Sequence, residues 1–271
     1  MTCRRRALWL GLCCLWLAWP SQAQAQEESL ALYYFHRPPF YFREGQAGSG
    51  CQGLVLERAC RVLRAAGVPF TLVELPVKRV LQEIKWGHYG CGVGWFRLAA
   101  RQDYADFSLP LYQSQPLALV VNHLRAGGLP ARPSLGQVLT SGLTRGAVAG
   151  YAYGQEVDDL LARLRPPTVT ITGTSENMLR MVASGRCDYW LIDAEEAGWL
   201  LAHHPGPARA LELRPLAEVP PGQTRHLMCS KRVPPEVLQR IDQAIASLYG
   251  RLPEVPARPE PIPGGAGPRR P

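Results

Sequence analysis

Hydrophobic residues along the chain follow two spacings, which predict strands and helices in alternation. Short apolar runs bounded by polar residues predict strands, and apolar residues repeating every three or four positions predict helices. The predicted order strand–helix–strand–helix–strand comes from segments 29–36, 53–66, 69–75, 77–86 and 91–96. This order is typical of a largely parallel sheet covered by helices.

A second series of the same kind follows. Ser134 and Gln137 have the spacing of a capping box, so a helix is predicted to begin there. Strands are predicted at 117–121, 147–150, 168–172 and 187–192, and further helices at 155–164, 175–184 and 194–202. A strand at 224–230 and a helix at 235–249 complete the pattern, so the sequence predicts two α/β units in tandem.

The two ends of the chain differ from this pattern. Three arginines at 4–6 precede an uncharged apolar run at 7–19, and Ala23-Gln24-Ala25 has the form of a cleavage site. These features predict a cleavable secretory signal peptide over residues 1–25. The segment 251–271 is rich in proline and glycine and is predicted to be a disordered tail.

The net charge and the spacing of cysteines and histidines limit the classes of function that the chain could have. The formal net charge is +8, but three arginines lie in the signal peptide and the rest form no basic block. This distribution excludes a typical nucleic-acid-binding protein. No cysteine or histidine spacing of a zinc site and no phosphate-binding glycine motif occurs, so we predict neither a metal nor a cofactor. His203 and His204 are interpreted as surface residues.

Several motifs occur at spacings that resemble one protein family. They are Pro38-Pro39-Phe40; Gly53-Leu54-Val55-Leu56-Glu57; Gly94 and Arg101 before Phe107-Ser108-Leu109-Pro110-Leu111-Tyr112; and Gly185-Arg186-Cys187-Asp188 before Asp193. Over residues 29–250 the chain thereby resembles the extracellular solute-binding proteins of family 3, the polar amino-acid-binding components of bacterial ABC importers.

This resemblance implies the two-lobed periplasmic binding protein fold of type II, in which each lobe is a mostly parallel sheet flanked by helices. Lobe 1 would comprise residues 26–117 and 224–250, and lobe 2 residues 118–223 with the crossover strands. The implied function is capture of a carboxylate-bearing small molecule, an amino acid or a related compound, in the periplasm. The protein would be a monomer that delivers its ligand to an inner-membrane ABC permease and has no catalytic activity.

The resemblance also assigns roles to residues. Arg101 stands where the family's arginine grips the ligand's α-carboxylate, a group that a planar guanidinium pairs with through two donors. Asp193 matches the lobe-2 carboxylate that receives the ligand's ammonium group. Further ligand-binding residues are expected to be Gly94, Phe40, Trp95, Tyr34 and Tyr151.

Other interpretations of these residues stay open. Arg101 could form a surface ion pair with Asp103 or Asp106, and Asp193 could be the N-cap of the helix that follows it. Phe40 and Trp95 could be ordinary core residues.

Three departures from the family pattern bear on the ligand. Leu98 stands where a threonine or serine is usual, and the lobe-2 loop at 150–154 has tyrosines where glycine and threonine are usual. Arg37 follows the first strand, where a small or acidic residue is common. The tyrosines and Arg37 predict either a flatter, more aromatic or more anionic ligand than an ordinary α-amino acid, or a diverged site with no role in transport.

Two other functions are compatible with the same fold. The chain could be a periplasmic sensor or accessory module that reports a ligand to a membrane partner. It could also be an enzyme, a dehydratase or a lyase, with Glu57, His36 or Asp193 as general acid or base.

Five cysteines follow the signal peptide: Cys51, Cys60, Cys91, Cys187 and Cys229. In an oxidising compartment an odd number leaves at least one thiol unpaired. The family topology places the segments of Cys91 and Cys229 side by side in lobe 1, which implies a disulfide between them. Buried free thiols, Cys51–Cys60 and Cys51–Cys91 are the alternatives.

Overall fold

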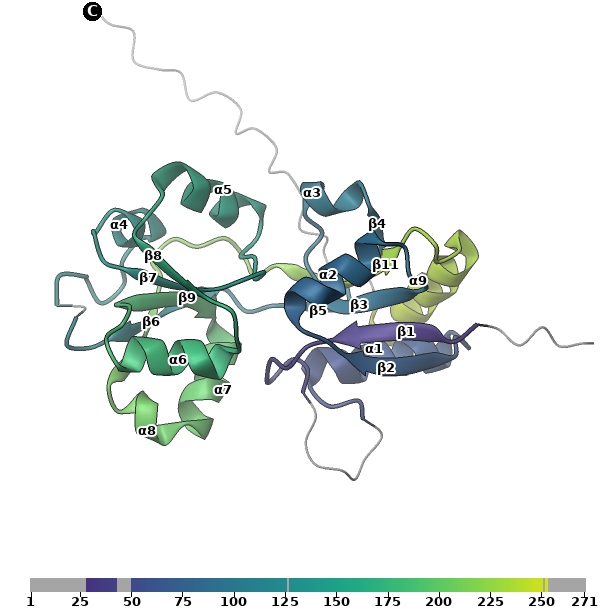
Figure 1. Ribbon diagram of the computed structural model, residues 1–271, viewed down its shortest axis with the longest axis horizontal. Coiled ribbons are helices and arrows are strands. Elements are labelled where there is room, and N and C mark those ends of the chain that lie inside the picture. The colour runs from purple at the N-terminus through teal and green to yellow at the C-terminus, as the bar shows by residue number, and fades with distance from the viewer. Residues whose placement is uncertain (1–27, 43–49, 126, 251, 253–271) are drawn as a thin grey trace, which may run out of the picture.

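The computed structural model of the chain describes residues 28–42, 50–125, 127–250 and 252. They form two lobes, each built on one sheet with helices packed against it (Figure 1). The predicted signal peptide lies outside the described residues, as does the predicted tail apart from residue 252. No helix in the described ranges is long and apolar enough to cross a membrane.

Lobe 1 is the lobe that contains both ends of the described chain. Its elements are β1 (Leu30–Tyr34), α1 (Leu54–Ala65), β2 (Phe70–Glu74), α2 (Val77–Lys85), β3 (Gly90–Trp95), α3 (Ala99–Gln102), β4 (Ala105–Phe107), β5 (Tyr112–Gln113), β11 (Thr224–Ser230) and α9 (Pro235–Tyr249). The sheet has the strand order β2-β1-β3-β11-β4, and β5 also pairs with β11.

Lobe 2 is formed by the middle of the chain. Its elements are β6 (Leu117–Asn122), α4 (Leu135–Leu139), β7 (Arg145–Val148), α5 (Gln155–Leu164), β8 (Thr168–Ile171), α6 (Ser175–Ala183), β9 (Tyr189–Asp193), α7 (Ala194–His203), α8 (Pro205–Ala208) and β10 (Leu211–Pro215). The strand order is β10-β6-β9-β7-β8. The predicted capping box is present at the start of α4.

The lobe-2 sheet is buried on both faces, as β6 illustrates. Leu119 and Val121 pack into one hydrophobic cluster, and Val120 between them packs into the cluster on the opposite face. Successive side chains of a strand point to opposite faces, so a continuous apolar run is suited to a sheet covered on both sides.

Both sheets are mixed rather than mostly parallel. β1 pairs in parallel with β2 and β3, and β7 with β8 and β9. The strands nearest the crossings between the lobes, β6 and β11, pair antiparallel with their neighbours. They enter the sheets from the opposite lobe and so run against the strands of the βαβ units, which the sequence prediction did not include.

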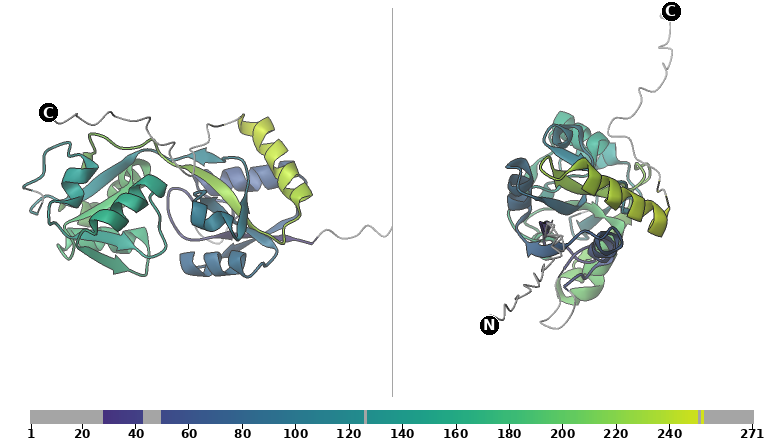
Figure 2. Two further views of the ribbon diagram at one scale, coloured as in Figure 1. Left: turned by 90° about the horizontal axis from the view of Figure 1, so that it is seen from above. Right: turned by 90° about the vertical axis from the view of Figure 1, so that its right-hand side faces the viewer.

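The chain crosses between the lobes twice, at 114–116 and 216–223, and the two crossings contact each other. Ser114 N–H donates a hydrogen bond to the carbonyl of Gln223 (2.9 Å). A Cβ on Gly222 would lie 1.7 Å from the Ser114 carbonyl oxygen, so only glycine permits this approach. Figure 2 shows β11 leaving the crossing and leading through lobe 1 to α9.

Two disulfides lie in lobe 1. Cys91 on β3 and Cys229 on β11 are register partners on neighbouring strands, and they form the pair that the resemblance implied. Cys51 and Cys60 are also bridged, which the sequence left as an alternative. Cys187 is buried and unpaired, in keeping with the odd number of cysteines.

Candidate functional site

Arg101 lies at the cleft between the lobes, on the short helix α3. Its side chain is largely buried, Nη1 donates to the carbonyl of Phe96 (3.0 Å), and Cζ lies 4.8 Å from the ring centroid of Trp95. Among the described residues no carboxylate forms an ion pair with it, and Asp106 pairs with Lys231 instead. The alternative of a surface ion pair is therefore absent, and burial lowers the pKa of Arg101.

A small cavity of about 20 Å³ lies beside this guanidinium. It is lined by Arg101, Gly94 and Trp95 from lobe 1 and by Tyr151 from lobe 2, so the structure brings four of the predicted ligand-binding residues together. Gly94 has a positive φ of 76°, and a Cβ there would lie 2.7 Å from the ring of Tyr41. Glycine is thus required for the aromatic packing behind this cavity.

A larger cavity of about 480 Å³ lies next to the small one. Phe35, Val77 and Tyr151 line both cavities. The larger cavity adds the charged side chains of Glu74 and Lys78 from lobe 1, and the segment 172–174 from lobe 2. Its volume is in the range of small-molecule sites in proteins.

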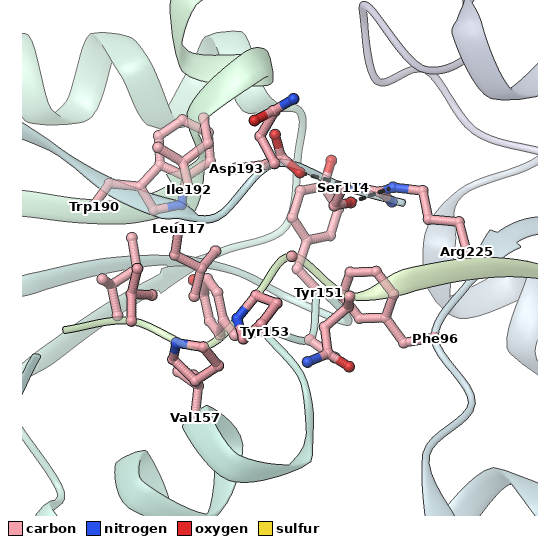
Figure 3. A pocket seen from close by; sticks show the side chains of 18 of the residues that line it. Phe96, Ser114, Leu117, Tyr151, Tyr153, Val157, Trp190, Ile192, Asp193 and Arg225 are labelled. Carbon is pink, nitrogen blue, oxygen red and sulfur yellow. Dashed lines mark hydrogen bonds and ion pairs between the residues drawn. The ribbon is translucent and has the colours of Figure 1, made fainter. Parts of the chain in front are cut away.

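Asp193 is buried at the end of β9, where its partners include Ser114 and the two groups described next. Its Oδ1 accepts from the backbone N–H of Glu195 (2.9 Å), so it is the N-cap of α7. Its Oδ2 lies 3.7 Å from Nη2 of Arg225 (Figure 3). Burial raises the pKa of Asp193, and the positive charge of Arg225 partly offsets that effect.

Arg225 is a completely buried arginine that sequence reasoning missed. Its Nε donates to Ser114 Oγ (2.8 Å), and its Cζ lies 4.0 Å from the ring centroid of Phe40. It therefore links β11, the first crossing and Asp193 of lobe 2 at the hinge (Figure 3). A single arginine near the start of an apolar strand is the signal that points to such a buried partner.

Arg37 forms a two-point ion pair with Glu196 on α7 of lobe 2. The distances are 3.0 Å from Nε to Oε1 and 2.7 Å from Nη2 to Oε2. The prediction that Arg37 selects a more anionic ligand is therefore not supported, because its charge is already neutralised. Glu196 lies 159 residues away along the chain, so no local pattern indicated it.

Two of the predicted ligand-binding residues lie in the core of lobe 1. Phe40 is completely buried, beneath the guanidinium of Arg225. Tyr34 is also buried, and its hydroxyl donates to Glu74 (3.3 Å). Both belong to the main hydrophobic cluster of lobe 1, and neither lines the cavity beside Arg101, so the structure agrees with the core interpretation of Phe40.

Asp158 on α5 supplies negative charge on the lobe-2 side of the cleft. Its two carboxylate oxygens accept from the backbone N–H of Tyr153 (3.1 and 3.2 Å). Burial raises the pKa of Asp158 to about 6, although the positive charge of Arg101 across the cleft acts to lower it. Asp158 is a second residue that the sequence did not single out.

The acidic, histidine and cysteine side chains form no metal site in the part of the chain that the structure describes. No group of three or more of them is placed to hold a metal ion there. His203 instead stacks on Trp199, with ring centroids 4.0 Å apart.

His36 of lobe 1 makes a further contact between the lobes, with Glu176 on α6 (Nε2 to Oε1, 3.3 Å). The hydrogen bond that His36 donates to Glu176, together with the negative charges of Glu176 and Glu74, raises the pKa of His36 above its ordinary value of 6.5. Burial acts to raise the pKa of Glu176, but the hydrogen bond donated by His36 lowers it to about 2. This carboxylate therefore stays charged at ordinary pH. The pair is therefore complete only when His36 is protonated.

The contribution of His36 to stability should depend on pH with a definite sign. A histidine whose pKa is raised by folding contributes its full stabilisation when the pH is below the pKa of the unfolded state. This contribution is lost as the pH rises through the pKa of the folded state. We expect His36→Gln to lower the melting temperature at about pH 5.5 and to have little effect at about pH 8.5. Thermal unfolding measures the difference, with the exposed His123→Gln as control. An equal loss at both pH values would contradict the assignment.

No protein-family model and no curated protein sequence matches the chain. Solved structures of other proteins do match it. An ancestral arginine-binding protein bound to arginine is 18% identical, with a TM-score of 0.65, over 81% of this chain and 91% of that one. The amino acid ABC transporter substrate-binding protein AbpA from Streptococcus pneumoniae, bound to L-arginine, is 20% identical, with a TM-score of 0.65, over 81% and 88%.

The GluR0 ligand-binding core from Nostoc punctiforme, in complex with L-glutamate, is 18% identical, with a TM-score of 0.63, over 81% of this chain and 92% of that one. These matches span both lobes and nearly the whole length of the compared chains. At such low identity they establish a common architecture. The chain therefore has the two-lobed fold of the amino-acid substrate-binding proteins of ABC transporters.

Proposed function

We propose that this protein is an exported solute-binding protein that holds a small carboxylate-bearing ligand, an amino acid or a related compound, between its lobes for ABC import. The observation that carries the proposal is Arg101, a buried guanidinium at the cleft without an ion-pair partner among the described carboxylates. A buried charge is costly unless it is paired, and a ligand carboxylate would supply the pair. The fold shared with amino-acid-binding proteins agrees with this function.

The cavities indicate how such a ligand would lie. Its carboxylate would reach Arg101, and its body would extend along Phe35, Val77 and Tyr151 toward the larger cavity. Phe35 and Tyr151 are in ring contact, with centroids 5.9 Å apart, so a flat apolar portion would pack against aromatic surface.

The carboxylate expected to bind the amino group of a ligand is already occupied by partners within the protein. Asp193, the expected acceptor, is already held by Arg225 and by the N-terminus of α7. An ammonium group would have to compete with Arg225 for this carboxylate. The proposal therefore requires a carboxylate on the ligand and does not require an amino group.

Binding of matched ligand pairs tests this function. A panel of amino acids, their carboxamides and their deaminated analogues is screened by thermal shift, and hits are titrated by calorimetry. We expect one-to-one binding of at least one carboxylate and at least about tenfold weaker binding of its carboxamide, a difference of about 1.4 kcal/mol.

The outcomes separate the candidate functions. Recovery of the ligand chemically unchanged supports a binding protein, whereas turnover would favour an enzyme. A carboxamide that binds as tightly as its carboxylate, or a panel in which no carboxylate binds, would contradict the proposal.

A further inference from the structure

The cleft is closed by side chains of the protein itself. The cavity beside Arg101 is about 20 Å³, which is room for roughly one water molecule and too little for an amino acid. The lobes are nevertheless in contact through Arg37 and Glu196, through His36 and Glu176, and through the hydroxyl of Tyr112 and Glu195. Each of these contacts is made between side chains of the protein itself.

The most complete of these contacts is the pair of Arg37 and Glu196. Arg37 belongs to the loop after β1 in lobe 1, and Glu196 lies in the first turn of α7 in lobe 2. The side chain of Glu196 is completely inaccessible to solvent, and that of Arg37 is 11% exposed. Two parallel hydrogen bonds between a guanidinium and a carboxylate fix both distance and orientation.

The guanidinium of Arg37 sits in a pocket built mainly from lobe 2. Its Cζ lies 4.2 Å from the ring centroid of Tyr151, and Ser175 Oγ donates to Glu196 Oε1 (2.5 Å). The Tyr151 hydroxyl is within hydrogen-bond distance of Ser175 Oγ (3.3 Å). Carboxylate, hydroxyl and aromatic face together provide what a bound cationic ligand needs.

We propose that Arg37 acts as an internal ligand, whose ion pair with Glu196 holds the two lobes closed when no solute is bound. Opening the cleft would separate both bonds at once, together with the stacking on Tyr151. A solute that reaches Arg101 must therefore bind to the fraction of molecules in which this contact has opened. The apparent affinity for the solute is reduced accordingly.

The proposal concerns the same cleft as the proposed function, but its test uses no solute, so either can fail without the other. Protein freed of small molecules by unfolding, dialysis and refolding is measured by small-angle X-ray scattering. We expect the wild-type curve to fit the closed structure. A wild-type protein that is open under these conditions would overturn the proposal directly, whatever the variants do.

Variants then test the role of the pair itself. Arg37→Ala and Glu196→Gln should each increase the radius of gyration, because the lobes lose the two-point ion pair between them. The control Arg232→Ala, which breaks an exposed pair with Glu28 within lobe 1, should leave the scattering unchanged. Closed scattering from both folded cleft variants would contradict the proposal.

Chemical rescue separates the ion pair from a general loss of packing. Methylguanidinium should fill the site left in Arg37→Ala and return its scattering toward the closed form. It should have no such effect on Glu196→Gln, which lacks the carboxylate. Equal responses of the two variants would show that the closure does not depend on this pair.

Discussion

Replacing Arg101 with alanine should weaken the binding of a carboxylate ligand by on the order of 100-fold or more, about 2.7 kcal/mol. Arg101 is largely buried at the cleft, and among the described residues its side chain makes a single hydrogen bond, to the Phe96 carbonyl. Its removal would leave a ligand carboxylate buried without a counter-charge. Calorimetry with the ligand identified in the panel measures the loss.

A matched control removes the same charge elsewhere in lobe 1. Arg61 is exposed on α1, so Arg61→Ala should leave the affinity unchanged. Arg101→Lys is informative as well, because lysine keeps the charge but lacks the two-point geometry, and intermediate affinity is expected. A loss of less than about fivefold in Arg101→Ala would refute the role of this residue.

Removing the disulfide between Cys91 and Cys229 should produce the largest loss of stability of any change considered for lobe 1. The bridge spans 138 residues and ties β11, which returns from lobe 2, to β3. In the chain-entropy description a loop of this length corresponds to about 5 kcal/mol of free energy of unfolding. The double variant Cys91→Ala with Cys229→Ala, unfolded in urea, measures the effect.

The second bridge is the natural comparison. Cys51 and Cys60 are separated by nine residues, for which the same description gives about 2.5 kcal/mol. The pair Cys51→Ala with Cys60→Ala should therefore lose about half as much stability. Non-reducing peptide mapping first establishes that both bridges form, and a peptide linking Cys51 to Cys91 would rule out this connectivity.

The regular elements could be predicted because their sequence periods are clear. The bounds predicted for α5, β11 and α9 agree with those observed, since each has a distinct apolar pattern and a Pro or Gly near one end. The short strands β4 and β5 and the edge strand β10 were not predicted. Strands of two or three residues carry too few positions for an alternation to be recognised.

The site could be predicted in part. The position of Arg101 at the cleft followed from its place in the family motif, and the capping role of Asp193 followed from the helix after it. The partners of Arg37 and Arg225 could not be inferred, because both lie in the opposite lobe. Their pairing depends on how the lobes close, which no local pattern specifies.

The expectation drawn from Arg37 was limited in the same way. An arginine after the first strand suggests an anionic ligand as long as its surroundings are unknown. The structure shows that Glu196 supplies the negative charge from within the chain. A charged residue in a cleft thus indicates a ligand only after internal ion pairs have been excluded. No described carboxylate forms an ion pair with Arg101, although the charge of Asp158 acts on it across the cleft.

A crystal structure of the protein with the carboxylate identified in the panel tests the central claim most directly. The account predicts one ligand molecule between the lobes, with its carboxylate oxygens at about 3 Å from the Arg101 guanidinium nitrogens. Its body should lie against Tyr151. A ligand whose carboxylate binds elsewhere, with Arg101 still bonded only to the Phe96 carbonyl, would contradict the account.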